Sequence, residues 1–173
     1  AFKEKGYEVL YLVDPVDEIM TQWLPEFESK KLKSIAKGAA DLGEGKDLKK
    51  KEQEYAKLID ALGKKLADRV KEVRLSSRLT SSPACLVVAE DDVSPNLEKL
   101  LNQVKGETTK QKRIMELNPD HEIIVKMSER AEDSMFDDFA EVLYGCALLA
   151  EGSELVDSFR FNQAVVRVLA KTI

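Results

Sequence analysis

The stretch MFDDFAEVLYGCALLAEGSELVDSFRFNQAVVRVLAK, residues 135–171, decides how the end of this chain folds. Its apolar residues recur every three or four positions, which predicts one helix over about Met135–Ala150 and another over about Phe159–Lys171. Gly152 follows the first helix, and glycine is common where a helix ends in a left-handed turn. Asp157-Ser158 precedes the second helix and can cap its free N–H groups. The sequence therefore predicts that two helices joined by a short turn end the chain.

These two helices are more apolar than packing on one side requires. A helix that packs on one side needs an apolar stripe of about 100°. From Val142 onward the first helix is apolar around most of its circumference. The second has one apolar face, formed by Phe161, Ala164, Val165, Val168 and Leu169. The excess favours self-association, in which two helix pairs form a four-helix bundle about a two-fold axis. Equally open is a monomer whose core both helices close.

The rest of the chain predicts alternating strands and helices. Asp14-Pro15 is typical of a helix start, and Pro25 should end or kink that helix. A charged helix begins at Asp47, and its expected buried stripe is Tyr55, Leu58, Ile59, Leu62 and Leu66. A shorter amphipathic helix spans about Ser94–Lys105. Another helix begins at Asn118-Pro119, with Ile123, Ile124 and Met127 expected to face inward. The predicted strands are an apolar run at 7–13 buried on both faces, a short one at 32–36, and two at 73–75 and 84–89.

The composition is that of one globular domain with a heavily charged surface. Of 173 residues, 43% are hydrophobic and 34% are charged, and the net charge is −5. A duplex-binding domain usually has a basic face, so nucleic acid is disfavoured as a partner. The longest apolar runs, such as Val9–Val13, are far shorter than the roughly 18 residues needed to cross a membrane.

The start of the chain and its cysteines indicate its context. Ala1-Phe2-Lys3 has neither an initiator methionine nor the profile of a signal peptide, so we expect a domain cut from a longer protein. Cys85 and Cys146 are far apart and lack CxxC spacing. A disulfide scaffold is therefore disfavoured, and a reducing compartment fits best.

The residue patterns give little support for catalysis. His121 is the only histidine, so no His/Cys cluster for zinc is present. Neither GxGxxG nor GxxxxGK[ST] occurs, so the usual phosphate-binding loops are missing. Cys85 lies in a predicted buried strand and Cys146 in an apolar helix, where thiols are usually inert. We therefore predict no catalytic, cofactor-binding or metal-binding residue, and keep a small cysteine hydrolase as a disfavoured alternative.

Four stretches together resemble the C-terminal domain of the ninety-kilodalton heat-shock chaperone family. They are GYEVLYLVDPVDE (6–18), VRLSSRLTSSPACLV (73–87), MELNPDHEII (115–124) and VLYGCALLAEGSELVD (142–157). They occur in the family's order and extend over the chain. Each stretch alone is a weak signal, whereas four in the right order are a strong one.

The resemblance implies an α+β fold: a small mixed sheet with packed helices, ending in a helical hairpin that forms a four-helix bundle in the dimer. It divides the single domain into an α/β body at 1–133 and dimerisation helices at 134–173. It also implies a constitutive homodimer through the last two helices. The expected interface residues are Val142, Leu143, Cys146, Ala147, Leu149, Phe161, Ala164, Val165, Val168 and Leu169.

The same resemblance implies two surfaces that contact client proteins. The first is the helix after Asp14-Pro15, through Glu18, Ile19 and Gln22; some bacterial members have Trp where this chain has Ile19. The second is the Ser94–Lys105 helix, whose apolar stripe usually would pack on its own core but here is expected to be partly exposed. That stripe consists of Leu97, Leu100, Leu101 and Val104.

The resulting hypothesis is the homodimerisation and client-contact domain of an ATP-dependent chaperone that assists protein folding under stress. ATP and magnesium would be bound by the parent's N-terminal and middle domains, so no cofactor is expected in this chain. The expected partners are a second copy, unfolded or partly folded clients and co-chaperones, with no nucleic acid and no membrane. The chain lacks the acidic tail of eukaryotic cytosolic members, so it resembles a bacterial, cytoplasmic member, with an organellar one as second choice. A stand-alone interaction adaptor of the same fold is the alternative.

Overall fold

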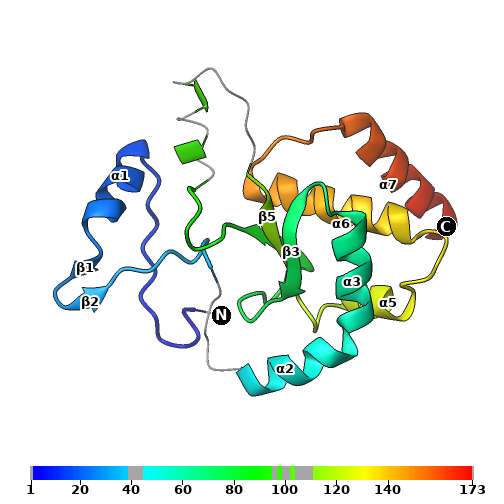
Figure 1. Ribbon diagram of the computed structural model, residues 1–173, viewed down its shortest axis with the longest axis horizontal. Coiled ribbons are helices and arrows are strands. Elements are labelled where there is room, and N and C mark those ends of the chain that lie inside the picture. Colours follow the sequence, from blue (N-terminus) through cyan, green and yellow to red (C-terminus); the bar gives the residue numbers. More distant parts are fainter. Residues whose placement is uncertain (1, 39–44, 95–96, 99–101, 104–110, 173) are drawn as a thin grey trace.

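The computed structural model describes residues 2–38, 45–94, 97–98, 102–103 and 111–172. Its centre is a three-stranded sheet in which β5 (Arg113–Leu117) lies between β3 (Val70–Leu75) and β4 (Ala84–Val87). β3 runs parallel to β5, and β4 runs antiparallel to it, so this sheet is mixed. The remaining elements are arranged around this sheet (Figure 1).

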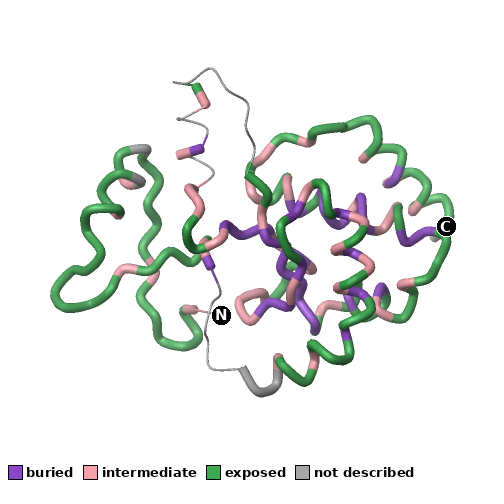
Figure 2. Tube along the Cα trace, in the orientation of Figure 1, coloured by how far each residue is buried: buried purple, intermediate pink, exposed green. Residues whose placement is uncertain are grey.

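One face of the sheet carries the apolar core. Successive side chains of a strand point to opposite faces, so alternate residues of the three strands share this face. Helix α3 (Ala56–Lys65) contacts β3, and helix α6 (Phe136–Glu151) contacts β4. The two helices also contact each other. Buried residues are concentrated in the sheet and these helices (Figure 2). The strand residues in the core are Val70, Val73, Leu75, Ala84, Leu86, Met115 and Leu117.

The charged helix predicted from Asp47 onward is two helices, α2 (Gly45–Glu54) and α3, which meet at Tyr55. Tyr55 is buried, and its hydroxyl donates a hydrogen bond to the carbonyl oxygen of Pro119 at 2.7 Å. Leu58, Leu62 and Leu66 are fully buried, as their four-residue spacing predicted. The predicted stripe is thus confirmed except at Ile59, which is half-buried, and the break between the two helices was missed.

Helix α5 (Glu122–Glu129) begins after His121, whose Nδ1 accepts a hydrogen bond from the Ile123 N–H at 3.2 Å. Ile124 and Met127 are buried, as predicted. The prediction for Ile123 is wrong, since 49% of this residue is exposed. Positions 124 and 127 share the face toward the core, whereas position 123 is turned about 100° away from 124.

The two C-terminal helices have the predicted extents within a residue or two. α6 ends at Gly152, which adopts the left-handed conformation with φ 80°. α7 (Ser158–Thr172) then packs back along α6 (Figure 1). In the part of the chain that the structure describes, no helix is long and apolar enough to cross a lipid bilayer.

The N-terminal segment 2–38 extends away from the helices of the core (Figure 1). It contains α1 (Pro15–Trp23) and a hairpin of two short strands, β1 (Glu26–Phe27) and β2 (Lys30–Lys31). Asp14 and Asp17 form a capping box at the start of α1, which ends before Pro25, as predicted.

Both strands predicted in this segment are wrong. Residues 7–13 form no strand, and Tyr11 and Val13 are 75% and 84% exposed. A run of β-branched residues becomes a strand only when another strand pairs with it, and among the described residues none does. Residues 32–36 follow β2 and form no strand either; the bridge comes one residue later, where Lys37 pairs with Val88.

Candidate functional site

The contact between α6 and α7 is closest where Gly145 faces Phe161. A Cβ atom built on Gly145 would overlap the Phe161 ring, so only glycine permits this approach. Ala164, three residues further along α7, is fully buried. Small residues on both helices therefore allow the two backbones to lie close together.

Ion pairs add to this apolar contact. The Arg167 guanidinium donates to both carboxylate oxygens of Asp138, at 2.9 and 2.6 Å. Glu141 is 8% exposed and accepts from Arg69 at 2.9 Å, and Arg160 lies 3.0 Å from its second oxygen. Hydrogen bonding to Arg167 holds the pKa of Asp138 below its ordinary range. Ion pairs as well as apolar packing therefore hold α7 against α6, and an ion pair with Arg69 holds α6 against the body.

The predicted interface residues fall into three groups within this structure. Leu143, Ala147 and Ala164 are buried within the chain, so their apolar character is explained without a partner. Val142, Phe161, Val165 and Val168 are half-buried. The exposed members are Cys146, Leu149 and Leu169, of which the two leucines are each 52% exposed.

A further apolar face of α7 was missed in the sequence. Phe159 and Val166 are 71% and 58% exposed and, with Leu169, lie on the side opposite Ala164. Phe159 and Val166 flank a shallow groove of about 280 Å³ whose other lining residues are Asn162, Gln163 and Arg167. The seven-residue spacing of Phe159 and Val166 is the signal that could have identified this face. We call the exposed apolar residues Cys146, Leu149, Phe159, Val166 and Leu169 the outer face of the helix pair.

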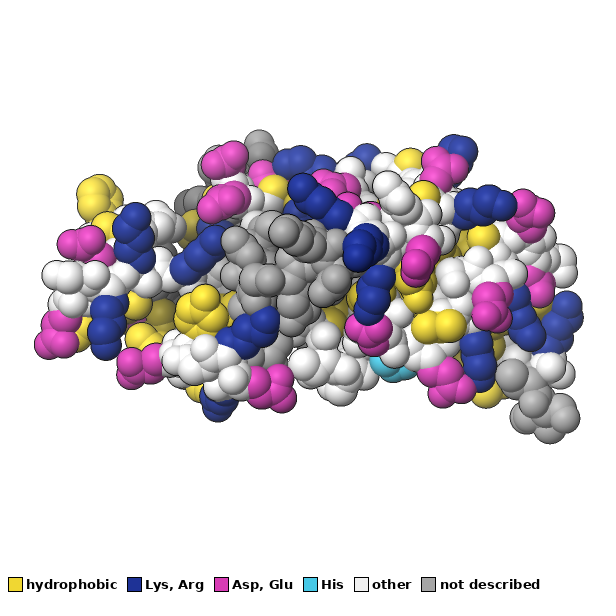
Figure 3. Space-filling model, turned by 90° about the horizontal axis from the view of Figure 1, so that it is seen from below, with side chains coloured by type: hydrophobic (Ala, Val, Ile, Leu, Met, Phe, Trp, Pro, Cys, Tyr) yellow, Lys and Arg dark blue, Asp and Glu magenta, His cyan; other side chains and the backbone are white. Residues whose placement is uncertain are grey.

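The second candidate surface lies on α1. Ile19 is 53% exposed and Gln22 is also exposed, whereas the side chain of Glu18 lies outside the described residues. Most of the exposed large apolar side chains in the described chain lie before Gly38, and Figure 3 shows apolar side chains among charged ones at this end of the molecule. α1 contributes a stripe at helical spacing, namely Val16, Ile19, Met20 and Trp23.

The third candidate surface is only partly described. Leu97 is half-buried, while Leu100, Leu101 and Val104 lie outside the described residues. Glu98 is 8% exposed and forms an ion pair with Arg113 of β5. A buried ion pair therefore joins Glu98 to the sheet.

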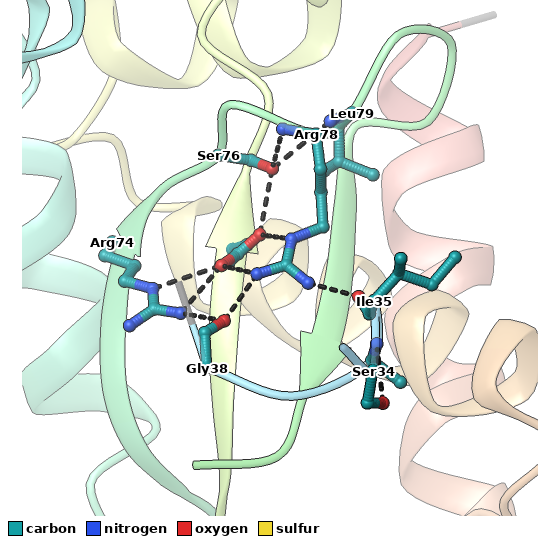
Figure 4. A network of polar contacts seen from close by, with 9 residues as sticks. Ser34, Ile35, Gly38, Arg74, Ser76, Arg78 and Leu79 are labelled. Carbon is teal, nitrogen blue, oxygen red and sulfur yellow. Dashed lines mark hydrogen bonds and ion pairs between the residues drawn. The ribbon is translucent and has the colours of Figure 1, made fainter. Parts of the chain in front are cut away.

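The face of the sheet opposite the apolar core holds a buried polar network (Figure 4). The Glu116 carboxylate, 2% exposed, accepts hydrogen bonds from Arg74 at 2.8 Å and Ser76 at 2.9 Å, and Arg78 lies 2.8 Å away. Both arginines also donate to the carbonyl oxygen of Gly38. This network joins the N-terminal segment to the sheet. The buried Glu116 carboxylate is paired with two arginines, and the Gly38 carbonyl oxygen accepts from both of them as well.

The environment of Cys85 opposes a nucleophilic role for its thiol. Burial raises the pKa of the half-buried Cys85 thiol to about 11, and the negative charge of Glu116 adds to this shift. An activated cysteine needs the opposite shift. Cys146, which was predicted to lie in the dimer interface, is exposed in the single chain. Within the described ranges, no three His, Cys, Asp or Glu side chains are grouped so that they could hold a metal ion.

Comparison with known proteins gives the family. The model of the family described as Hsp90 protein matches residues 1–173, so the chain belongs to the Hsp90 family of heat-shock chaperones. It is similar to the bacterial chaperone protein HtpG: 48% identical to that of Frankia casuarinae and 44% to that of Salinispora arenicola. The HtpG of Mycobacterium tuberculosis is 43% identical. In each case all of this chain is covered, but only 28%, 29% and 28% of the relative, so the chain spans little more than a quarter of their length.

Proposed function

We propose that this chain is the C-terminal part of an Hsp90-family chaperone and joins two copies of it through α6 and α7. The order of the four family-like stretches along the chain supports the assignment to the C-terminal part. In this proposal, residues 1–133 form the body and residues 134–173 the dimerisation helices, which make a four-helix bundle with their copies.

The observation that carries the proposal is the apolar outer face of the helix pair. α6 already packs on the sheet and α7 packs on α6, yet Leu149, Val166 and Leu169 are each more than half exposed. Fully burying one such side chain is favourable by roughly 1.5–3 kcal/mol. A second copy related by a two-fold axis offers the same face in return, so both copies gain this burial. A stable interface should bury about 1,200–2,000 Å² in total.

A charge-substitution experiment tests the dimer. Replacing Leu149 and Val166 by Glu places carboxylates where they would be buried between the copies, which is costly without a partner. Light scattering after size-exclusion chromatography should report a dimer for the unchanged chain and a monomer for the double variant.

Ile123→Glu is the matched control for this experiment. Ile123 is 49% exposed, close to the 52% of Leu149, but lies on α5 and not on the helix pair. This variant should remain dimeric. If the unchanged chain is a monomer at tens of micromolar, or if the control dissociates equally, the proposed interface is wrong.

We further propose that the apolar stripe of α1 and the part of the chain around Leu97 contact partly unfolded clients. The exposed residues Val16, Ile19 and Trp23 support this role, because apolar stripes rimmed by polar residues mark binding surfaces. ATP and magnesium would act in parts of the parent beyond this chain, so we expect this chain alone to show no nucleotide turnover. The parent is proposed to act in the bacterial cytoplasm.

A further inference from the structure

Arg113 connects two distant parts of the chain through one guanidinium group. Its Nη2 donates to Glu98 Oε2 at 2.5 Å, and its Nε donates to Glu151 Oε1 at 3.1 Å. Glu98 precedes Arg113 by 15 residues, and Glu151, the last residue of α6, follows it by 38. Arg113 itself begins β5, so one rigid strand holds the guanidinium between the two carboxylates.

Each carboxylate in this arrangement has a second hydrogen-bond donor. Glu98 Oε1 accepts from the Gln111 N–H at 2.7 Å, and Glu151 Oε2 accepts from the Ser153 hydroxyl at 2.8 Å. Ser153 lies in the turn between α6 and α7. The carboxylates of Glu98 and Glu151 are therefore each held in a fixed orientation toward Arg113.

The three side chains are almost fully removed from solvent. Those of Glu98, Arg113 and Glu151 are 10%, 11% and 11% exposed. Water cannot readily replace a lost partner at this depth, and charge-assisted hydrogen bonds are stronger there than at a surface. Loss of one contact must therefore be accommodated by movement of the groups that remain.

We propose that Arg113 couples the part of the chain around Glu98 to the C-terminal end of α6, so that displacement of either one loosens the other. The two contacts use different nitrogens of one planar group, so both form together, and each one holds the guanidinium in the position that the other contact requires. The coupling is reciprocal, as any coupling between two equilibria must be. The roles of the two ends, client contact and dimerisation, rest on the proposed function, whereas the coupling itself does not.

Hydrogen exchange measured by mass spectrometry tests the coupling in the 173-residue chain. The variants are Glu98→Gln, Glu151→Gln and Arg113→Gln, and the readouts are peptides covering 97–103 and 149–155. Glu98→Gln should raise exchange at 149–155 by at least about fivefold, and Glu151→Gln should do the same at 97–103, the lower end of usual coupling. In the Arg113→Gln background, neither substitution should have a further effect on the remote peptide.

Asp138→Asn is the matched control. It removes an ion pair of α6 with Arg167 but none with Arg113, so exchange at 97–103 should stay unchanged. Where a Gln variant does not fold, Arg113→Lys keeps the charge while losing the forked geometry, and it should raise exchange at both peptides. An unchanged remote peptide in both single variants, or an equal effect of Asp138→Asn, overturns the coupling. Light scattering reports the dimer separately, so failure of the dimer and failure of the coupling give different results.

Discussion

The half-buried Cys85 pairs across β4 and β5 with the buried Glu116. Burial of the thiol and the negative charge of Glu116 both oppose formation of the thiolate, while Arg78 and Arg74 act in the other direction. Burial is the largest of these effects, so the pKa of Cys85 rises despite the two nearby arginines. A raised pKa disfavours the thiolate, which is the reactive form of cysteine.

Alkylation of Cys85 should therefore be slow in the folded chain. Its pKa is about 11, against an ordinary value of 9.0, which lowers the thiolate fraction near pH 8 by about 100-fold. In a Cys146→Ser variant, iodoacetamide should label Cys85 far more slowly in buffer than in urea.

The raised pKa of Cys85 also determines how the stability of the fold depends on pH. The folded chain holds this proton more tightly than the unfolded chain. The stabilising contribution of Cys85 is therefore complete below pH about 9 and is lost as the pH rises through about 11. Equal labelling rates in buffer and in urea at pH 8 would contradict this assignment.

At the scale of elements, the packing of α7 on α6 depends on a residue that has no side chain. Gly145 lies in the interior of α6, where glycine is unfavourable by about 1 kcal/mol relative to alanine. Its presence is explained by the Phe161 ring, which occupies the space that a Cβ would need. Glycine at position 145 thus lowers the helix propensity of α6 but allows a closer contact between the two helices.

Gly145→Ala should weaken that contact, and Gly63→Ala in α3 is the matched control. Both substitutions gain the same helix propensity, but a Cβ on Gly63 meets nothing within 4 Å. The difference between the two variants therefore isolates the clash, which we expect to cost about 1–3 kcal/mol. Urea unfolding followed by circular dichroism measures it. Equal free energies of unfolding would show that α7 does not depend on Gly145.

At the scale of the whole molecule, the chain has a compact body and an apolar N-terminal segment that the body does not cover. Val13 and Trp23 are more than four-fifths exposed, whereas the core around Leu58 and Met115 is completely buried (Figure 2). Removing exposed apolar side chains costs a folded protein little. Binding of an unfolded protein, in contrast, depends on such surfaces. Stability and client contact should therefore respond differently to substitution here.

Trp23→Ala should separate the two properties. The free energy of unfolding should change by less than about 0.5 kcal/mol, while suppression of the thermal aggregation of citrate synthase should weaken. Val156→Ala is the control, because Val156 is 78% exposed, close to the 83% of Trp23, but lies between α6 and α7. Unaltered suppression by Trp23→Ala, or an equal loss in both variants, would remove α1 from the client surface.

The amino-acid sequence by itself determined the features that depend on neighbouring residues. The stripe Leu58, Leu62 and Leu66, the cap before α1 and the end of α6 at Gly152 were all predictable, because spacing and local hydrogen bonds decide them. The composition could not predict where apolar residues would be exposed. The run at 7–13 has strand-forming residues but no partner strand among the described residues, and Leu143 and Leu149 differ in burial although both are leucines of α6.

Only the tertiary structure decided which faces are covered and which distant groups meet. Nothing in the spacing of Glu98, Arg113 and Glu151 predicts that one guanidinium binds both carboxylates. The same is true of the Phe161 ring over Gly145. Burial depends on the atoms that fill the space around a side chain, and in this chain those atoms come from residues tens of positions away.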